Sequence, residues 1–136
     1  MAGAIPHGRN LDTDFLFTKL VVDDLDRAVE FYGSVFGLIE MHRLDAEITG
    51  RAISEVVFMP TCEGGPMFVL AKFHDKAGPV AGETILGFAT GDLHALLDRA
   101  VKAGGRVAEQ SAAGSFRHAF VIDPEGHLVQ ISQAVG

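Results

Sequence analysis

Two side chains are candidates for acid–base chemistry because each interrupts an apolar, β-favourable segment. Lys19 lies within FLFTKLVV, residues 15–22, and His118 lies within FRHAFVI, residues 116–122. Imidazole titrates near neutral pH, and desolvation lowers the pKa of an amine, so either group could move a proton. Two simpler interpretations stay open. The Lys19 ammonium could reach the rim of a site while its methylene groups pack on apolar surface. The His118 imidazole could simply form a hydrogen bond with a neighbouring side chain or with water.

Other reactive side chains in the sequence are weaker candidates. The remaining histidines are expected in an arm, a linker, strand ends or a polar helix face, and they are His7, His42, His74, His94 and His127. Three basic residues could be charges at the rim of a binding site: Arg51, Lys72 and Arg117. Gly64-Gly65 precedes an expected strand rather than a helix, so it is not a phosphate-binding loop. Cys62 is the only cysteine, which excludes an internal disulfide and fits the reducing cytoplasm.

Composition limits the class of protein. The 136 residues are 48% hydrophobic and 21% charged, which is typical of one globular domain. The formal net charge of −7, without a Lys/Arg cluster, argues against nucleic acid as a partner. No apolar run approaches the roughly 20 residues of a membrane span, and the first residues lack the apolar core of a signal peptide. We therefore expect a cytoplasmic protein without membrane or nucleic-acid partners.

An internal repeat organises the chain. The segment Phe15–Leu38 reads as a strand, an Asp-capped helix and a glycine exit, and Glu83–Val107 repeats this order. The offset is 68 residues, from Asp24 to Asp92 and from Gly37 to Gly105. Apolar residues recur at helical spacing after each aspartate, as expected for a helix packed on a sheet. Two such copies predict one half-fold used twice.

The strand pattern predicts a β-α-β-β-β order in each half. Expected strands cover residues 15–22, 38–44, 52–59, 67–73, 84–90, 106–109, 116–122 and 127–133. We expect turns or loops at Asp45–Gly50, at Gln110–Ser115 and at Asp123–Gly126, whose Asp-Pro-Glu-Gly order suits a type I turn. The predicted organisation is a flexible arm (1–14) and a single domain (15–136) made of modules 15–73 and 84–133 joined by a linker (74–83).

Two motifs carry a family resemblance. VVDDLDRAVEFYGSVFGL, residues 21–38, and DPEGHLVQI, residues 123–131, resemble the vicinal oxygen chelate superfamily, which includes glyoxalase I, dioxygenases and bleomycin-resistance proteins. The resemblance spans roughly residues 15 to 133. It implies an α+β fold of two βαβββ modules, whose curled mixed sheet surrounds a cleft, usually within a homodimer. In metal-using members, ligands from the first and last strand of each module point into this cleft.

The sequence departs from the family at these ligand positions. The matching residues are Phe17, Val69, Ile85 and Gln130, so three of the four offer no donor atom. A lone carboxamide will not hold a divalent ion against water. We therefore expect no metal and no other cofactor, and a cleft with an apolar lining.

These positions define the predicted site. Strand alternation from Phe17 places Lys19 in the cleft, and a family substrate position at Phe120 places His118 there. The predicted substrate-binding residues are Phe15, Phe17, Val69, Ile85, Phe120 and Gln130, with Lys19 and His118 as catalytic candidates. The chain is expected to bind a small apolar or aromatic molecule, which it either sequesters or converts in a lyase or isomerase step. The alternatives are a glyoxalase- or dioxygenase-type metal enzyme with relocated ligands, or a partner-binding module with a closed cleft.

Overall fold

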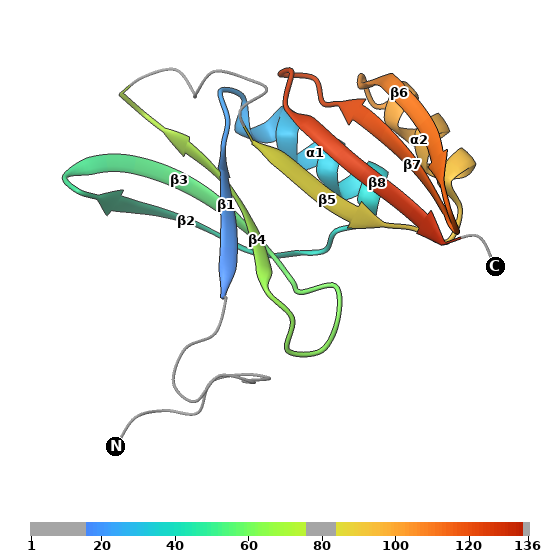
Figure 1. Ribbon diagram of the computed structural model, residues 1–136. Coiled ribbons are helices and arrows are strands. Elements are labelled where there is room, and N and C mark those ends of the chain that lie inside the picture. The colour runs from blue at the N-terminus through green and yellow to red at the C-terminus, as the bar shows by residue number, and fades with distance from the viewer. Residues whose placement is uncertain (1–15, 76–83, 135–136) are drawn as a thin grey trace.

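The computed structural model describes residues 16–75 and 84–134, which form two β-α-β-β-β modules (Figure 1). The first contains β1 (Phe17–Val21), α1 (Leu25–Phe36), β2 (Glu40–Ile48), β3 (Arg51–Phe58) and β4 (Met67–Phe73). The second contains β5 (Ile85–Ala89), α2 (Leu93–Lys102), β6 (Arg106–Ala113), β7 (Phe116–Ile122) and β8 (Leu128–Ala134). The α+β class and the two modules are confirmed, whereas the predicted arm (1–14), Phe15 and most of the predicted linker lie outside the described residues.

Each module builds its own four-stranded mixed sheet. The strand orders are β1-β4-β3-β2 and β5-β8-β7-β6. In each sheet the first strand of the module pairs in parallel with the last, and the remaining neighbours are antiparallel. The two sheets are not joined into a closed barrel, so β1 and β5 are both edge strands of their sheets.

Both helices begin and end as their sequence signals predict. The Asp24 carboxylate accepts a hydrogen bond from the Arg27 amide at 3.1 Å, and Asp92 accepts one from the Ala95 amide at the same distance. Each bond satisfies an amide that has no partner within the helix. Gly37 ends α1 in the left-handed conformation, with φ of 68°.

Gly105, the repeat counterpart of Gly37, is small for a different reason. A Cβ atom at Gly105 would lie 2.9 Å from Phe31 Cε1 and 3.0 Å from the Ile122 carbonyl oxygen. The left-handed conformation after α2 belongs instead to Gly104, with φ of 94°. The repeated glycine thus ends one helix by its backbone conformation and permits close packing after the other.

Two predicted loops are wrong because the hairpins are longer than expected. The segment Asp45–Gly50 was predicted to be a turn, but β2 pairs with β3 as far as its last residue, and the turn is Thr49 and Gly50 alone. Both turn residues have positive φ, 52° and 78°, as a two-residue hairpin turn requires. Similarly, most of Gln110–Ser115 belongs to β6, which turns at Gly114 and the residue after it. Threonine rarely adopts positive φ, so the sequence signal for the first turn is weak.

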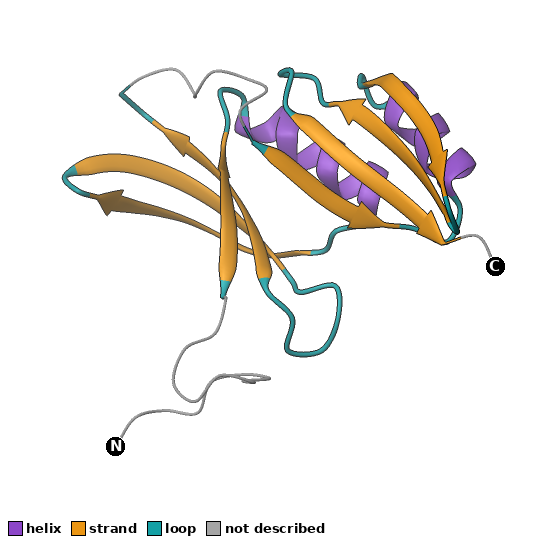
Figure 2. Cartoon of the chain, in the orientation of Figure 1, coloured by secondary structure: helices purple, strands orange, loops and turns teal. Residues whose placement is uncertain are grey.

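One hydrophobic core joins the modules. It gathers buried side chains from both helices and from the helix-facing sides of both sheets, among them Leu20, Val22, Phe31, Tyr32, Val35, Leu96, Leu97, Val121, Val129 and Ile131. Figure 2 shows α1 and α2 together on one side of the second sheet. The opposite faces of the two sheets, which we call the outer faces, therefore point away from this core.

Hydrogen bonds also join the modules at the turn between β7 and β8. The buried Tyr32 hydroxyl of α1 donates to Asp123 Oδ2 at 2.9 Å. The two carboxylate oxygens of Glu125 accept from the backbone amides of Asp23 and Asp24, at 2.8 and 2.7 Å. Burial, and secondarily the negative charge of Asp123, raises the pKa of Tyr32 far above its ordinary value. The Asp-Pro-Glu-Gly turn of one module thus holds the helix of the other.

Three weaker sequence candidates can be placed in the described structure. Cys62 is a free, exposed thiol in the loop between β3 and β4. His94 is exposed on α2, as its polar helix position predicts, whereas His127 is only 3% exposed.

Across the described segments, neither helix is long and apolar enough to cross a membrane.

Candidate functional site

The outer face of the first sheet carries half of the predicted site. Phe17 is 40% exposed there, and Lys19 lies directly opposite Val69 in the parallel pairing of β1 with β4. The alternate residues Leu20 and Val22 are buried in the core, as the predicted alternation requires. Val69 is only 3% exposed, in contrast to Phe17, so it lies at the base of the predicted site rather than at its rim.

The outer face of the second sheet carries the other half. Phe120 lies opposite Gln130, and His118 lies opposite Ser132, across the antiparallel pairing of β7 with β8. His118 Nδ1 is 2.9 Å from Ser132 Oγ, so the imidazole has the neighbouring partner that the simpler interpretation allowed. Ile85 is 58% exposed on the edge strand β5. The fold therefore brings His118, Phe120 and Gln130 together on adjacent strands.

The four positions where the family places metal ligands do not offer a metal site. Phe17, Val69 and Ile85 have hydrocarbon side chains, and the amide oxygen of Gln130 is the single donor among the four. In residues 16–75 and 84–134, no group of three or more His, Cys, Asp or Glu side chains is placed to hold a metal ion. The donor set present therefore does not fit a divalent cation.

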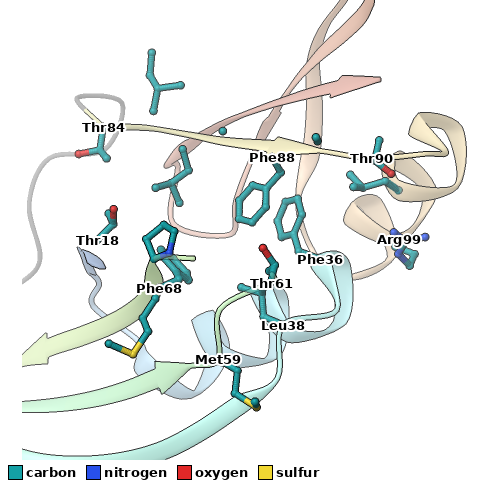
Figure 3. Close-up of a pocket in the computed structure, with 17 residues that line it drawn as sticks. Thr18, Phe36, Leu38, Met59, Thr61, Phe68, Thr84, Phe88, Thr90 and Arg99 are labelled. Atoms are coloured by element: carbon teal, nitrogen blue, oxygen red, sulfur yellow. The ribbon is translucent and has the colours of Figure 1, made fainter. Parts of the chain in front are cut away.

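A pocket of about 630 Å³ lies between the modules, and we call it the inter-module pocket (Figure 3). It is bounded by β5, the end of α1, the start of β4 and part of the loop between β3 and β4. Aromatic rings form part of its wall, where Phe36 and Phe88 stack with centroids 4.0 Å apart. Of the predicted site residues, Ile85 lines this pocket, but Phe17, Val69, His118 and Gln130 do not. The pocket is thus separate from most of the predicted site.

Sequence reasoning missed one charged residue on the outer face of the first sheet. Glu55 of β3 is only 6% exposed, and its Oε2 lies 2.5 Å from Lys19 Nζ. A signal for it existed, because Glu55 falls between Ile53 and Val57 on one face of a strand that is mostly apolar after Arg51. A carboxylate in such a run is expensive to bury unless it is paired.

Comparisons with known proteins agree on the kind of fold. The family model described as the Glyoxalase/Bleomycin resistance protein/Dioxygenase superfamily matches residues 15–131. A probable lactoylglutathione lyase from Vibrio parahaemolyticus is 26% identical over 124 residues, which cover 87% of this chain and 88% of the relative.

Solved structures show the same architecture. A glyoxalase family protein from Bacillus cereus superposes with a TM-score of 0.76 at 19% identity, covering 98% of this chain and 100% of its own. The trypanothione-dependent glyoxalase I of Leishmania major superposes with a TM-score of 0.72 at 19% identity, covering 89% of this chain and 86% of its own. At these identities the structural likeness shows the fold alone.

Proposed function

The chain belongs to the Glyoxalase/Bleomycin resistance protein/Dioxygenase superfamily, and on this premise we propose that it binds a small, largely apolar or aromatic molecule without a metal ion. The observation that carries this proposal is the replacement of three donor positions by Phe17, Val69 and Ile85. If the metal ligands had been lost without apolar replacements, the cleft would be polar and hydrated. Replacement by hydrocarbon side chains instead suits an apolar ligand, because small-molecule sites are mostly apolar with a few placed polar groups.

We further propose that the binding cleft forms between two chains of a homodimer. The outer face of the first sheet in one chain would oppose the outer face of the second sheet in its partner. Supporting this arrangement, the two halves of the predicted site lie on separate sheets, and large apolar side chains are exposed on or beside them: Phe17, Met41, Leu44, Ile85 and Phe116. Covering such surface is the usual reason for a stable dimer.

In this cleft the ligand would contact apolar walls and a small polar set. The proposed contacts are Phe15, Phe17, Val69, Ile85, Phe120 and Gln130. Lys19 and His118 would orient the ligand, and in an enzyme they would move a proton to or from it. Binding alone would amount to sequestration, as in a resistance protein.

A catalytic role is a second candidate, favoured by one specific observation. The 26% identity to a probable lactoylglutathione lyase extends along most of both chains. For this chain we therefore include a lyase or isomerase step, with His118 or Lys19 as the proton carrier. A metal enzyme with relocated ligands such as His118 and Gln130 is the alternative, and metal content separates it from the first proposal.

A cytoplasmic location is part of the proposal. The exposed thiol of Cys62, the only cysteine of the sequence, supports it. Thiols of this kind persist in a reducing compartment.

Titration with a fluorescent probe tests the binding proposal. We expect chelator-treated protein to bind phenylnaphthylamine, an uncharged aromatic probe, in a saturable manner. Phe17→Glu and Phe120→Glu should each weaken this binding at least about tenfold, because each buries a carboxylate in the apolar cleft.

Met59→Glu is the matched control, because Met59 is 46% exposed and lines the inter-module pocket instead. Binding that survives both phenylalanine replacements but is lost in the Met59 variant would place the probe in the inter-module pocket and refute the proposed cleft. An unchanged fold by circular dichroism is required of all three variants.

A further inference from the structure

The ion pair between Lys19 and Glu55 places a buried carboxylate among apolar side chains on the outer face of the first sheet. The side chain of Glu55 is 7% exposed and that of Lys19 is 30% exposed. The pair bridges three strands, because Lys19 lies on edge strand β1, Glu55 lies on β3, and β4 separates them. The Glu55 carboxylate is therefore the deeper group, and the Lys19 ammonium lies between it and the solvent.

The surroundings of the pair are apolar. Glu55 is flanked along its strand by Ile53 and Val57, which are 1% and 7% exposed, and Val69 beside Lys19 is 3% exposed. Glu55 Oε2 is buried and accepts no hydrogen bond of ordinary geometry within the described residues. Its contact with the Lys19 ammonium therefore carries its charge compensation.

A buried ion pair is poor evidence for stability. The cost of removing both charges from water roughly offsets their attraction, and an apolar pair of similar volume is often as stable. A buried polar group with incomplete hydrogen bonding accordingly calls for another explanation. Here the pair lies on the face that the proposed function assigns to the ligand.

The geometry leaves the ammonium available to a ligand. An ammonium has three donors, and the carboxylate of Glu55 lies on its inner side. Lys19 Nζ also lies 5.3 Å from the centroid of the Phe17 ring, so an aromatic surface adjoins the charge. A ligand with an aromatic body and an anionic oxygen would match both features at once.

We propose that Lys19, held by Glu55, is an anchor that selects ligands carrying an anionic oxygen, such as a carboxylate, sulfonate or phenolate, on an apolar or aromatic body. Lys19 contacts the ligand, and Glu55 is a positioning residue that acts through Lys19. This inference rests on the proposed function and names its class of ligand.

Two probes that differ by one charged group test the anchor. Anilinonaphthalene sulfonate is phenylnaphthylamine with an added sulfonate, so their affinities separate recognition of the anion from recognition of the rings. We expect Lys19→Met to weaken binding of the sulfonate probe at least about tenfold, and to leave binding of the neutral probe within about twofold.

Two control variants test whether the effect is specific to the charge of Lys19 and does not result from unfolding. Lys102→Met removes the same charge from the exposed last turn of α2 and should change neither affinity by more than about twofold, since solvent screens a distant surface charge. The double variant Lys19→Met/Glu55→Gln leaves no unpaired buried carboxylate, so it should remain folded and still show the selective loss.

The positioning role of Glu55 has its own readout. Glu55→Gln and Glu55→Leu both remove the negative charge, but only glutamine can still accept a hydrogen bond from the ammonium. The sulfonate probe should bind the glutamine variant at least about threefold more tightly than the leucine variant, with no such difference for the neutral probe. Equal affinities of the two variants would overturn the positioning role.

The outcomes separate the inference from the proposed function. Wild-type protein that binds neither probe would refute the proposed function itself. Wild-type protein that binds the neutral probe, combined with equal losses of both probes in the Lys19 variants or with no loss, would refute the anchor alone.

Discussion

Replacing Asp123 with alanine is expected to lower the free energy of unfolding by about 3 kcal/mol. The carboxylate is 5% exposed and accepts three hydrogen bonds of 2.9 Å, from the Tyr32 hydroxyl and from the backbone amides of Glu125 and His127. Alanine leaves these donors without their acceptor, and the Tyr32 hydroxyl is in the core. The bond from Tyr32 joins the second module to the helix of the first, and the other two bonds lie within the turn. Their loss should therefore weaken the contact between modules as well as the turn.

Urea denaturation measures this effect, and two variants calibrate it. Tyr32→Phe removes one bond and should cost about 1 kcal/mol. Asp98→Ala removes an exposed carboxylate of α2 that lies 3.6 Å from His94, and it should change stability by no more than about 0.5 kcal/mol. If Asp123→Ala were no more damaging than Asp98→Ala, the turn would not hold the modules together.

The hydrogen bond from Tyr32 to Asp123 also affects stability at high pH. Because the pKa of Tyr32 is raised above its ordinary value of 10.0, its contribution to stability is complete below that pH and is lost as the pH rises above it. Tyr32 is the only tyrosine, so tyrosinate absorbance reports this residue alone. We expect that absorbance to appear only as the protein unfolds, and Tyr32→Phe should lack this part of the alkaline loss of stability.

Mixed dimers are expected to show the second large effect. Phe17→Glu blocks the first-sheet half of the proposed cleft, and Phe120→Glu blocks the second-sheet half. Each variant alone should therefore bind phenylnaphthylamine at least about tenfold more weakly than the wild type. If each cleft takes one half from each chain, a dimer of the two variants contains one cleft with both changes and one intact cleft. Such a dimer should bind one probe molecule, compared with two for the wild type.

This experiment distinguishes two ways of building the cleft. If both halves came from the same chain, every cleft in the mixed dimer would carry one blocking residue, and no binding would return. Mixed dimers can be isolated through two different affinity tags, and probe stoichiometry can be measured by fluorescence titration. A monomeric protein by light scattering, or a mixed dimer that binds no probe, would contradict assembly between chains.

The sequence predicted features that depend on local spacing. The repeat from Asp24 to Asp92 placed both helix caps, and strand alternation from Phe17 identified the outer face on which Lys19 lies. Such rules involve residues a few positions apart, so the chain itself determines them. The long hairpin of β2 and β3 was missed because Thr49 adopts a positive φ that its residue type does not signal.

Features that depend on pairing between distant strands were missed. Glu55 meets Lys19 only because β4 lies between their strands, and no spacing in the sequence encodes that order. Glu125 was assigned to a hairpin turn, but its carboxylate also accepts from the amides of Asp23 and Asp24, about 100 residues earlier in the chain. The assignment of the site residues themselves remains a prediction, which the variants above address.

Metal content is the most direct test of metal-independent binding. Full-length protein would be purified without chelators, loaded with Ni, Zn, Mn or Fe, dialysed and subjected to elemental analysis. We expect metal far below one ion per chain, because Phe17, Val69 and Ile85 offer no donor and Gln130 offers a single weak one. Near-stoichiometric metal that resists dialysis would contradict this expectation and favour a metal enzyme with relocated ligands.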